Sequence, residues 1–156
     1  MKYINTLLLL AAATFSGCAT NNSSNMGSLE IQALQTKEFE CTKSVGLAAT
    51  ISVFQDYGYI IESADSVTGF ITAASPTSGG FQPFVGQVMK NSKATAFIEE
   101  IKPNITTIRL NFVDSKESSS GYGMKSKNDK PVLDPTYYND VFTKIGDSIF
   151  IRTASK

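Results

Sequence analysis

The stretch Ile105-Thr-Thr-Ile-Arg-Leu-Asn-Phe-Val-Asp114 decides the fold class, because apolar and polar residues alternate through its middle. Successive side chains of a β-strand point to opposite faces. Ile108, Leu110 and Phe112 therefore share one face, and the polar residues between them share the other. This alternation is typical of an antiparallel sheet with one dry face and one face open to water.

Other segments on both sides of this stretch have the pattern of further strands. They are Glu30–Phe39, Tyr59–Glu62, Gly69–Ala73 and Lys93–Lys102. Two segments, Ser75–Ser92 and Ser115–Asp134, lack a clear apolar period and are rich in Gly, Ser, Pro or Lys. Both are predicted to be loops, and the second is predicted to be long and mobile.

Two segments have helical periodicity instead. From Thr42 to Tyr57, apolar residues recur at spacings of three and four, with Thr42 as the expected N-cap and Gly58 as the expected left-handed C-cap. Asp134-Pro135 predicts the start of a second helix, with Asp as N-cap and Pro at the first position. The apolar face of this helix is formed by Tyr138, Val141, Phe142, Ile145 and Ile149.

The resulting order is β-α-β-β-β-β-α. It predicts an α+β fold in which a single antiparallel sheet carries two helices packed on one face. Phe54 and Phe142, one on each helix, are expected in the core. The domain is predicted to span residues 30–156, which is long enough to bury a core without metals or disulfides.

The N-terminal segment 1–17 has the composition of a secretory signal peptide. Lys2 precedes an apolar run from Ile4 to Phe15 that is too short to span a bilayer as a helix. The sequence Phe15-Ser-Gly-Cys18 resembles the lipobox of bacterial lipoproteins, in which the cysteine becomes the acylated first residue of the mature protein. An ordinary signal cleaved near Ala19, or an N-terminal helix that stays attached, is the alternative.

The resemblance implies that Cys18 carries acyl chains, which anchor a protein stably in a membrane when several are present. Residues 18–29 are mostly small and polar, which predicts a flexible tether. Ala19 and Thr20 follow the cysteine where inner-membrane lipoproteins of enterobacteria have Asp. The similarity therefore implies an outer-membrane lipoprotein whose domain faces the periplasm.

The composition bears on several function classes. Acidic and basic residues balance at 14 each, so the chain lacks the basic footprint that nucleic acid requires. The sequence contains no His, which is the commonest general base and a frequent metal ligand, and we predict neither a metal site nor a cofactor. Cys41 has no intramolecular partner if Cys18 is acylated. We expect it to be a small half-buried residue near an element boundary, and a reactive or intermolecularly paired thiol is the alternative.

The polar motifs do not predict catalysis. Glu99 and Glu100 are neighbours on a strand, so they point to opposite faces and cannot act as a pair. Asp65 lies in a hairpin turn, where Asp commonly binds its own backbone. Ser118–Ser120 have no His to activate a nucleophile, and Ser78-Gly-Gly80 lacks the Lys of a phosphate loop.

An apolar cluster in the first predicted loop is the candidate binding site. Its residues are Phe81, Phe84, Val85, Val88 and Met89. Gly and Pro interrupt any regular element there. The cluster either caps the core or offers anchors to a protein partner, because exposed apolar patches mark interaction sites.

The segment Phe54-Gln-Asp-Tyr-Gly-Tyr-Ile-Ile61, with Ala64-Asp65 and Gly69-Phe-Ile-Thr-Ala73, resembles a group of small Gram-negative lipoproteins that share this core. The element order is also similar to the helix-grip domains of the BamC-type lipoprotein of the barrel-assembly complex, in architecture only. We predict a non-enzymatic envelope lipoprotein that acts as an interaction or accessory module. The alternative is a carrier or sensor of a small apolar ligand held between helix and sheet.

Overall fold

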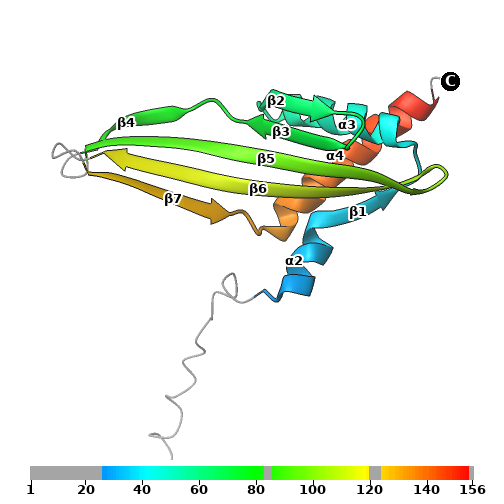
Figure 1. Cartoon of the computed structure of the whole chain (residues 1–156), viewed down its shortest axis with the longest axis horizontal. Helices are drawn as coiled ribbons and strands as arrows, with labels where there is room; N and C mark the ends of the chain where they lie inside the picture. The colour runs from blue at the N-terminus through cyan, green and yellow to red at the C-terminus, as the bar shows by residue number, and fades with distance from the viewer. Residues whose placement is uncertain (1–25, 83–85, 120–123, 155–156) are drawn as a thin grey trace, which may run out of the picture.

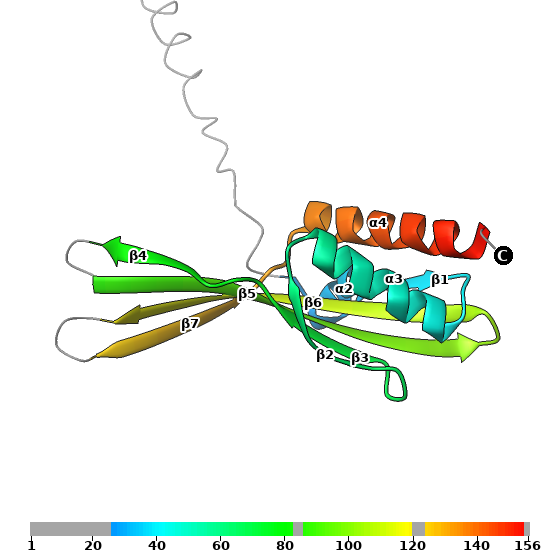
Figure 2. The ribbon, with the colours of Figure 1, turned by 90° about the horizontal axis from the view of Figure 1, so that it is seen from above.

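Seven antiparallel strands form one sheet, and two long helices pack on one of its faces (Figures 1 and 2). This computed structural model describes residues 26–82, 86–119 and 124–154. The helices are α2 (Ser28–Gln35), α3 (Lys43–Asp56) and α4 (Pro135–Ala154). The strands are β1 (Thr36–Phe39), β2 (Ile60–Asp65), β3 (Phe70–Ala74), β4 (Ser78–Gln82), β5 (Gly86–Lys102), β6 (Ile105–Ser119) and β7 (Lys125–Pro131).

Two strands of unusual length organise the sheet. β5 has 17 residues and β6 has 15, and they pair with each other along their length. At one end the strand order is β1-β6-β5-β3-β2, while at the other end β4 pairs with β5 and β7 pairs with β6. The predicted α+β class with a single antiparallel sheet, and the placement of α3 and α4 on one face, are confirmed (Figure 2).

The core lies between these two helices and the sheet. Phe54 and Phe142 are 1% and 3% exposed, as the helical periodicity predicts. The sheet contributes the expected alternating row, since Ile108, Leu110 and Phe112 are all buried. The Phe54 ring packs edge-on against Phe112 at a centroid distance of 5.9 Å, so the helix and sheet side chains interdigitate directly.

The start of α3 differs from the sequence prediction. Thr42 stands at the N-cap position, but its side chain makes no capping hydrogen bond. The backbone N–H of Lys43 instead donates to Glu100 Oε2 at 3.1 Å. The backbone N–H of Asn104, in the β5–β6 turn, donates to Glu100 Oε1 at 2.9 Å. Glu100 is remote in sequence, so local helix signals could not reveal this cap.

The end of α3 and the following hairpin behave as predicted. Gly58 adopts a positive φ of 80°, the left-handed conformation of a helix C-cap glycine. In the β2–β3 turn, Asp65 accepts hydrogen bonds from the Val67 amide at 2.8 Å and the Thr68 hydroxyl at 2.7 Å. These bonds hold the pKa of Asp65 below its usual range. Asp65, the last residue of β2, therefore holds the turn that follows it through its side chain.

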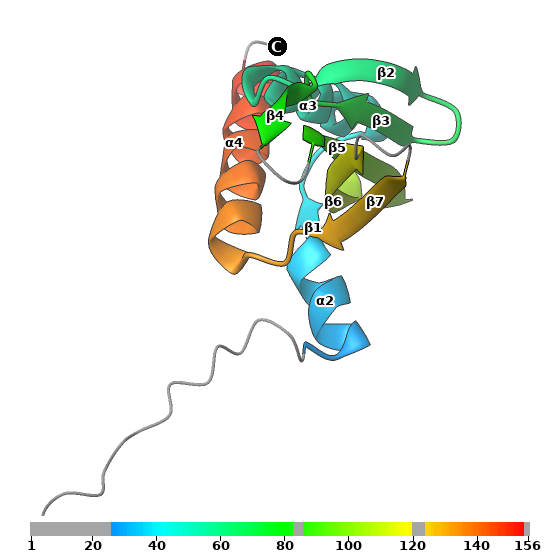
Figure 3. The ribbon, with the colours of Figure 1, turned by 90° about the vertical axis from the view of Figure 1, so that its left-hand side faces the viewer.

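The predicted first strand, Glu30–Phe39, is wrong over most of its length. Residues Ser28–Gln35 form helix α2, so regular structure begins inside the predicted tether, and only Thr36–Phe39 are extended. Leu34 packs against the core, while buried Gln35 donates to Asn111 Oδ1 and Tyr138 Oη, both at 3.4 Å. Eight residues are too few for periodicity to separate helix from strand. Figure 3 shows α2 apart from α3, beside β1.

Both predicted loops are also wrong, because each contains strands. Ser75–Ser92 contains β4 and the beginning of β5, and Ser115–Asp134 contains the end of β6 and all of β7. The element order is therefore α-β-α-β-β-β-β-β-β-α. These strands have polar residues on both faces because none of the described helices covers them (Figure 2). This removes the alternation by which a half-buried strand is recognised in a sequence.

Candidate functional site

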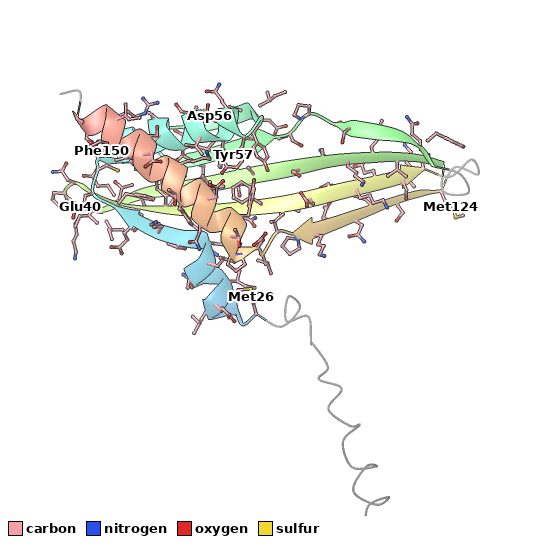
Figure 4. All side chains as sticks on the ribbon, turned by 180° about the vertical axis from the view of Figure 1, so that it is seen from behind. Met26, Glu40, Asp56, Tyr57, Met124 and Phe150 are labelled. Atoms are coloured by element: carbon pink, nitrogen blue, oxygen red, sulfur yellow. The ribbon has the colours of Figure 1, made fainter. Side chains whose placement is uncertain are left out.

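The sheet continues well beyond its two helices (Figures 1 and 2). We call this part the sheet extension. It consists of β4, residues 86–92 of β5, residues 113–119 of β6, and β7. The register places these strands side by side in the order β4-β5-β6-β7. Figure 4 shows Met124 at the tip of the extension and Phe150, on α4, at the opposite end of the molecule.

The two faces of the extension follow from the register, because antiparallel partners share a face. Lys90, Ser92 and Ala94 alternate with Met89, Asn91 and Lys93 along β5. Buried Ala94 packs in the core beneath the helices, so the first set belongs to what we call the helix-side face. Met89 and its set belong to the opposite, open face.

The structure splits the predicted apolar cluster between these faces. Phe81 pairs with Gln87, and Gly79 pairs with Met89, so Phe81 and Met89 are diagonal neighbours on the open face. Phe81 is 79% exposed and Met89 is 43% exposed. Val88 points the other way and is only 3% exposed, so it cannot belong to the same binding surface. The other two predicted members, Phe84 and Val85, lie outside the described residues.

A hollow of about 410 Å³ lies beside Met89 on the open face. Glu117 and Lys127, which are cross-strand partners, help to line it. Next to it, Lys127 forms an ion pair with Asp129 at 3.4 Å, and Ser115 Oγ donates to Asp129 at 2.7 Å. The Ser115 hydrogen bond holds the pKa of Asp129 below its usual range. The charges of this face are thus largely matched.

Apart from buried Val88, the helix-side face of the extension is polar, and sequence analysis did not single it out. One cross-strand row contains Ser78, Lys90, Lys116 and Asn128. The next row contains Ser92, Asp114 and Lys130, and the Ser92 hydroxyl donates to Asp114. The two rows line a hollow of about 480 Å³. Only knowledge of the strand register could have brought these residues together.

The helix-covered half contains titratable side chains in structural settings. Cys41 is 4% exposed, and burial raises the pKa of its thiol. The Tyr57 hydroxyl donates a hydrogen bond to Asp140. Burial is the larger cause that raises the pKa of Tyr57, and the contact with Asp140 is the second, so the phenol stays neutral. Cys41 is therefore a buried core residue, and the Tyr57–Asp140 contact joins α3 to α4.

The helix–sheet interface itself is filled by aromatic rings. Phe112 packs against Tyr137 and Tyr138 at centroid distances of 5.0 and 5.4 Å. The hollows on the extension lie outside this interface. The expected place for a carried apolar ligand is thus occupied by side chains, and the carrier hypothesis gains no support from the geometry.

The sequence-predicted lipidation site, Cys18, lies outside the described residues. Among residues 26–82, 86–119 and 124–154, no helix has the length and apolar character needed to cross a membrane. Within the same ranges, no three Cys, Asp or Glu side chains gather as a metal site would require.

No family model matches the chain, and no curated protein matches it. A solved structure described as a DUF4468 family protein from Bacteroides ovatus is similar with a TM-score of 0.40 and 13% sequence identity, covering 73% of this chain and 84% of that one. A likeness at this level does not establish a shared function.

Proposed function

We propose that the chain is a non-enzymatic envelope lipoprotein that binds a protein partner through the open face of its sheet extension. The observation that carries this proposal is the exposure of Phe81 beside Met89 on a part of the sheet that none of the described helices covers. The acylated terminus would be Cys18, and the domain would face the periplasm from the outer membrane.

Phe81 and Met89 have the properties of interface anchors. Aromatic residues and Met are enriched in protein interfaces, and complete burial of one such side chain contributes roughly 1.5–3 kcal/mol. Phe81 leaves most of its surface in water and is not part of the main core cluster. The matched charges around Met89 provide a polar rim of the kind that surrounds interface hot spots.

The tether constrains where the partner lies. Ser28, the first residue of α2, lies ten positions after Cys18. An extended chain of that length spans at most roughly 35 Å. An acylated Cys18 would therefore keep the first residue of α2 within that distance of the membrane surface, so we expect a partner that is itself in or near the outer membrane.

A non-enzymatic role is supported by the chemistry of the polar groups. The sequence has no His. The only free Cys described is buried, with a raised pKa that disfavours the nucleophilic thiolate. Glu100 and Asp65 are both engaged in backbone caps and turns. Each of these groups has a structural explanation.

The anchor is tested by Cys18→Ser. We expect this variant to lose membrane association or to remain unprocessed, as judged by fractionation and gel mobility. Unchanged fractionation and mobility would contradict the lipoprotein proposal.

The binding surface is tested by placing a photocrosslinking amino acid at position 81 or 89 in cells. Positions 29 and 67 are matched controls, because Leu29 and Val67 are 80% and 85% exposed but lie outside the extension. We expect a discrete crosslinked product from 81 and 89 alone. Equal products from the control positions would contradict a specific surface.

A further inference from the structure

The helix-side face of the extension places two lysines directly opposite each other. Lys90 on β5 and Lys116 on β6 are cross-strand partners, and both are exposed. Like charges in this arrangement are destabilising, because the Cβ atoms lie only about 5 Å apart. Lys130 on β7 stands in the next row, opposite Asp114, and adds a third ammonium group to the same face.

The carboxylates nearby do not neutralise these lysines. Asp114 is the only acidic residue in the two rows, and it accepts a hydrogen bond from Ser92. The other two acidic residues of the extension, Glu117 and Asp129, are on the open face opposite Lys127 and Ser115. Across the described ranges, the ion pair found is Lys127–Asp129 on that open face. Three lysines and one aspartate thus leave an excess positive charge on the helix-side face.

The same face is hollowed rather than flat. A space of about 480 Å³ lies over the two rows, and its lining includes the three lysines, Ser78, Asn128 and the carboxylate of Asp114. Lysine ammonium groups bind phosphate as mobile point charges, and Ser and Asn add neutral hydrogen-bond donors. A group with a charge near −2, such as a phosphate monoester, matches two adjacent ammonium groups better than a single carboxylate does.

We infer that this face is a binding site for a phosphate-bearing ligand, held between Lys90 and Lys116 with Lys130 and Asn128 at its side. The site is separate from the open-face surface of the proposed function and does not depend on a protein partner. Binding would relieve the repulsion between Lys90 and Lys116, so the arrangement becomes favourable only when the anion is present. The phosphate could be part of a lipid headgroup or of a soluble molecule.

The test uses the full chain in dodecyl maltoside micelles, titrated with inorganic pyrophosphate in a calorimeter. The double variant Lys90→Gln with Lys116→Gln is expected to weaken binding at least tenfold. The matched control is Lys125→Gln with Lys127→Gln, which removes the same charge from the open face of the same extension. The control should bind pyrophosphate within twofold of the wild type.

Failure of the wild type to bind pyrophosphate would overturn the inference. Equal weakening in the double variant and its control would overturn it too, because it would indicate general charge attraction without a site. Thermal melts of the variants confirm that each is folded. Lys90→Arg with Lys116→Arg should restore binding if the positive charge at these two positions is what matters.

The source of the phosphate is resolved by competition. Mixed micelles containing phosphatidic acid, whose headgroup is a phosphate monoester, should displace pyrophosphate if the site accepts a lipid headgroup, whereas micelles containing phosphatidylcholine serve as the zwitterionic comparison. Displacement by phosphatidic acid alone supports the site and assigns a lipid source. Pyrophosphate binding without displacement supports the site and assigns a soluble one.

Discussion

Strands β5 and β6 run through both the helix-covered half of the sheet and the sheet extension, but the described helices pack on them only in the covered half. Beneath α3 and α4, the helix-facing residues of β5 are Ala94, Ala96 and Ile98, all 2% exposed or less. A few residues earlier in the same strand, the same face holds Lys90 and Ser92. The difference follows from whether helices pack on that face of the sheet. A face packed against helices must be apolar, whereas a face exposed to water need not be.

This contrast separates folding from function along a single strand pair. The covered half contains the aromatic core and the Glu100 carboxylate that caps helix α3. The extension contains exposed apolar residues on one face and unmatched lysines on the other, and neither feature is needed to bury a core. Residues that the fold does not require are the ones we assign to binding.

The largest effect is expected in the covered half. Phe54→Ala removes a fully buried ring that contacts Phe112 and Tyr59. Such a truncation should lower the free energy of unfolding by about 3–5 kcal/mol. Phe142→Ala should act similarly from the second helix, whereas Phe81→Ala should change it by less than about 0.5 kcal/mol. Urea denaturation of the three variants measures the contrast, and equal losses would contradict it.

Gly69 and Gly58 allow the cost of a steric clash to be separated from the cost of a positive φ. Gly69 and Gly58 both have positive φ, 84° and 80°. A Cβ at Gly69 would lie 2.1 Å from the Ile98 carbonyl oxygen, while a Cβ at Gly58 meets nothing within 4 Å. Gly58→Ala should therefore cost about 1–2 kcal/mol from the backbone conformation alone, and Gly69→Ala should cost clearly more. Similar melting temperatures for the two variants would contradict the backbone contact.

The Glu100 cap predicts an acid-sensitive contribution to stability. Its hydrogen bonds from the Lys43 and Asn104 amides hold the Glu100 pKa below its usual range. A group with a depressed folded-state pKa stabilises the fold above its unfolded pKa, about 4.3 for Glu. That contribution is lost as the pH falls through the lower folded value. Glu100→Gln should therefore destabilise modestly at pH 7, and the difference from wild type should shrink below pH 4.3. A pH-independent difference would contradict this explanation.

A smaller effect of opposite sign is expected in the extension. Lys116→Gln removes the repulsion with Lys90 and should raise stability by about 0.2–1 kcal/mol. Lys127→Gln, on the other face, removes an exposed ion pair with Asp129 and should change stability little or lower it slightly. Comparing the two melting temperatures without added phosphate measures the difference. A loss of stability in Lys116→Gln would contradict the unrelieved repulsion.

The same contrast explains what the sequence reveals. The covered half was largely predictable, since α3, α4, β3 and the row Ile108, Leu110 and Phe112 all have a buried face that forces periodicity. The extension was not predictable, because β7 is polar on both faces and is exposed throughout. Phe81 and Met89 could be found as apolar residues in a polar segment. Lys90 and Lys116 could not be paired, because their proximity depends on a register that no local pattern records.

The most direct test combines stability and binding in one variant, Phe81→Ser with Met89→Ser. We predict that the melting temperature of this variant stays close to that of the wild type. In cells treated with a lysine-reactive crosslinker, we predict that the variant loses the crosslinked product that the wild type forms with its partner. Leu29→Ser with Val67→Ser should preserve both. A strongly destabilised Phe81→Ser/Met89→Ser variant, or one that keeps the crosslinked product, would contradict the assignment of binding to the uncovered extension.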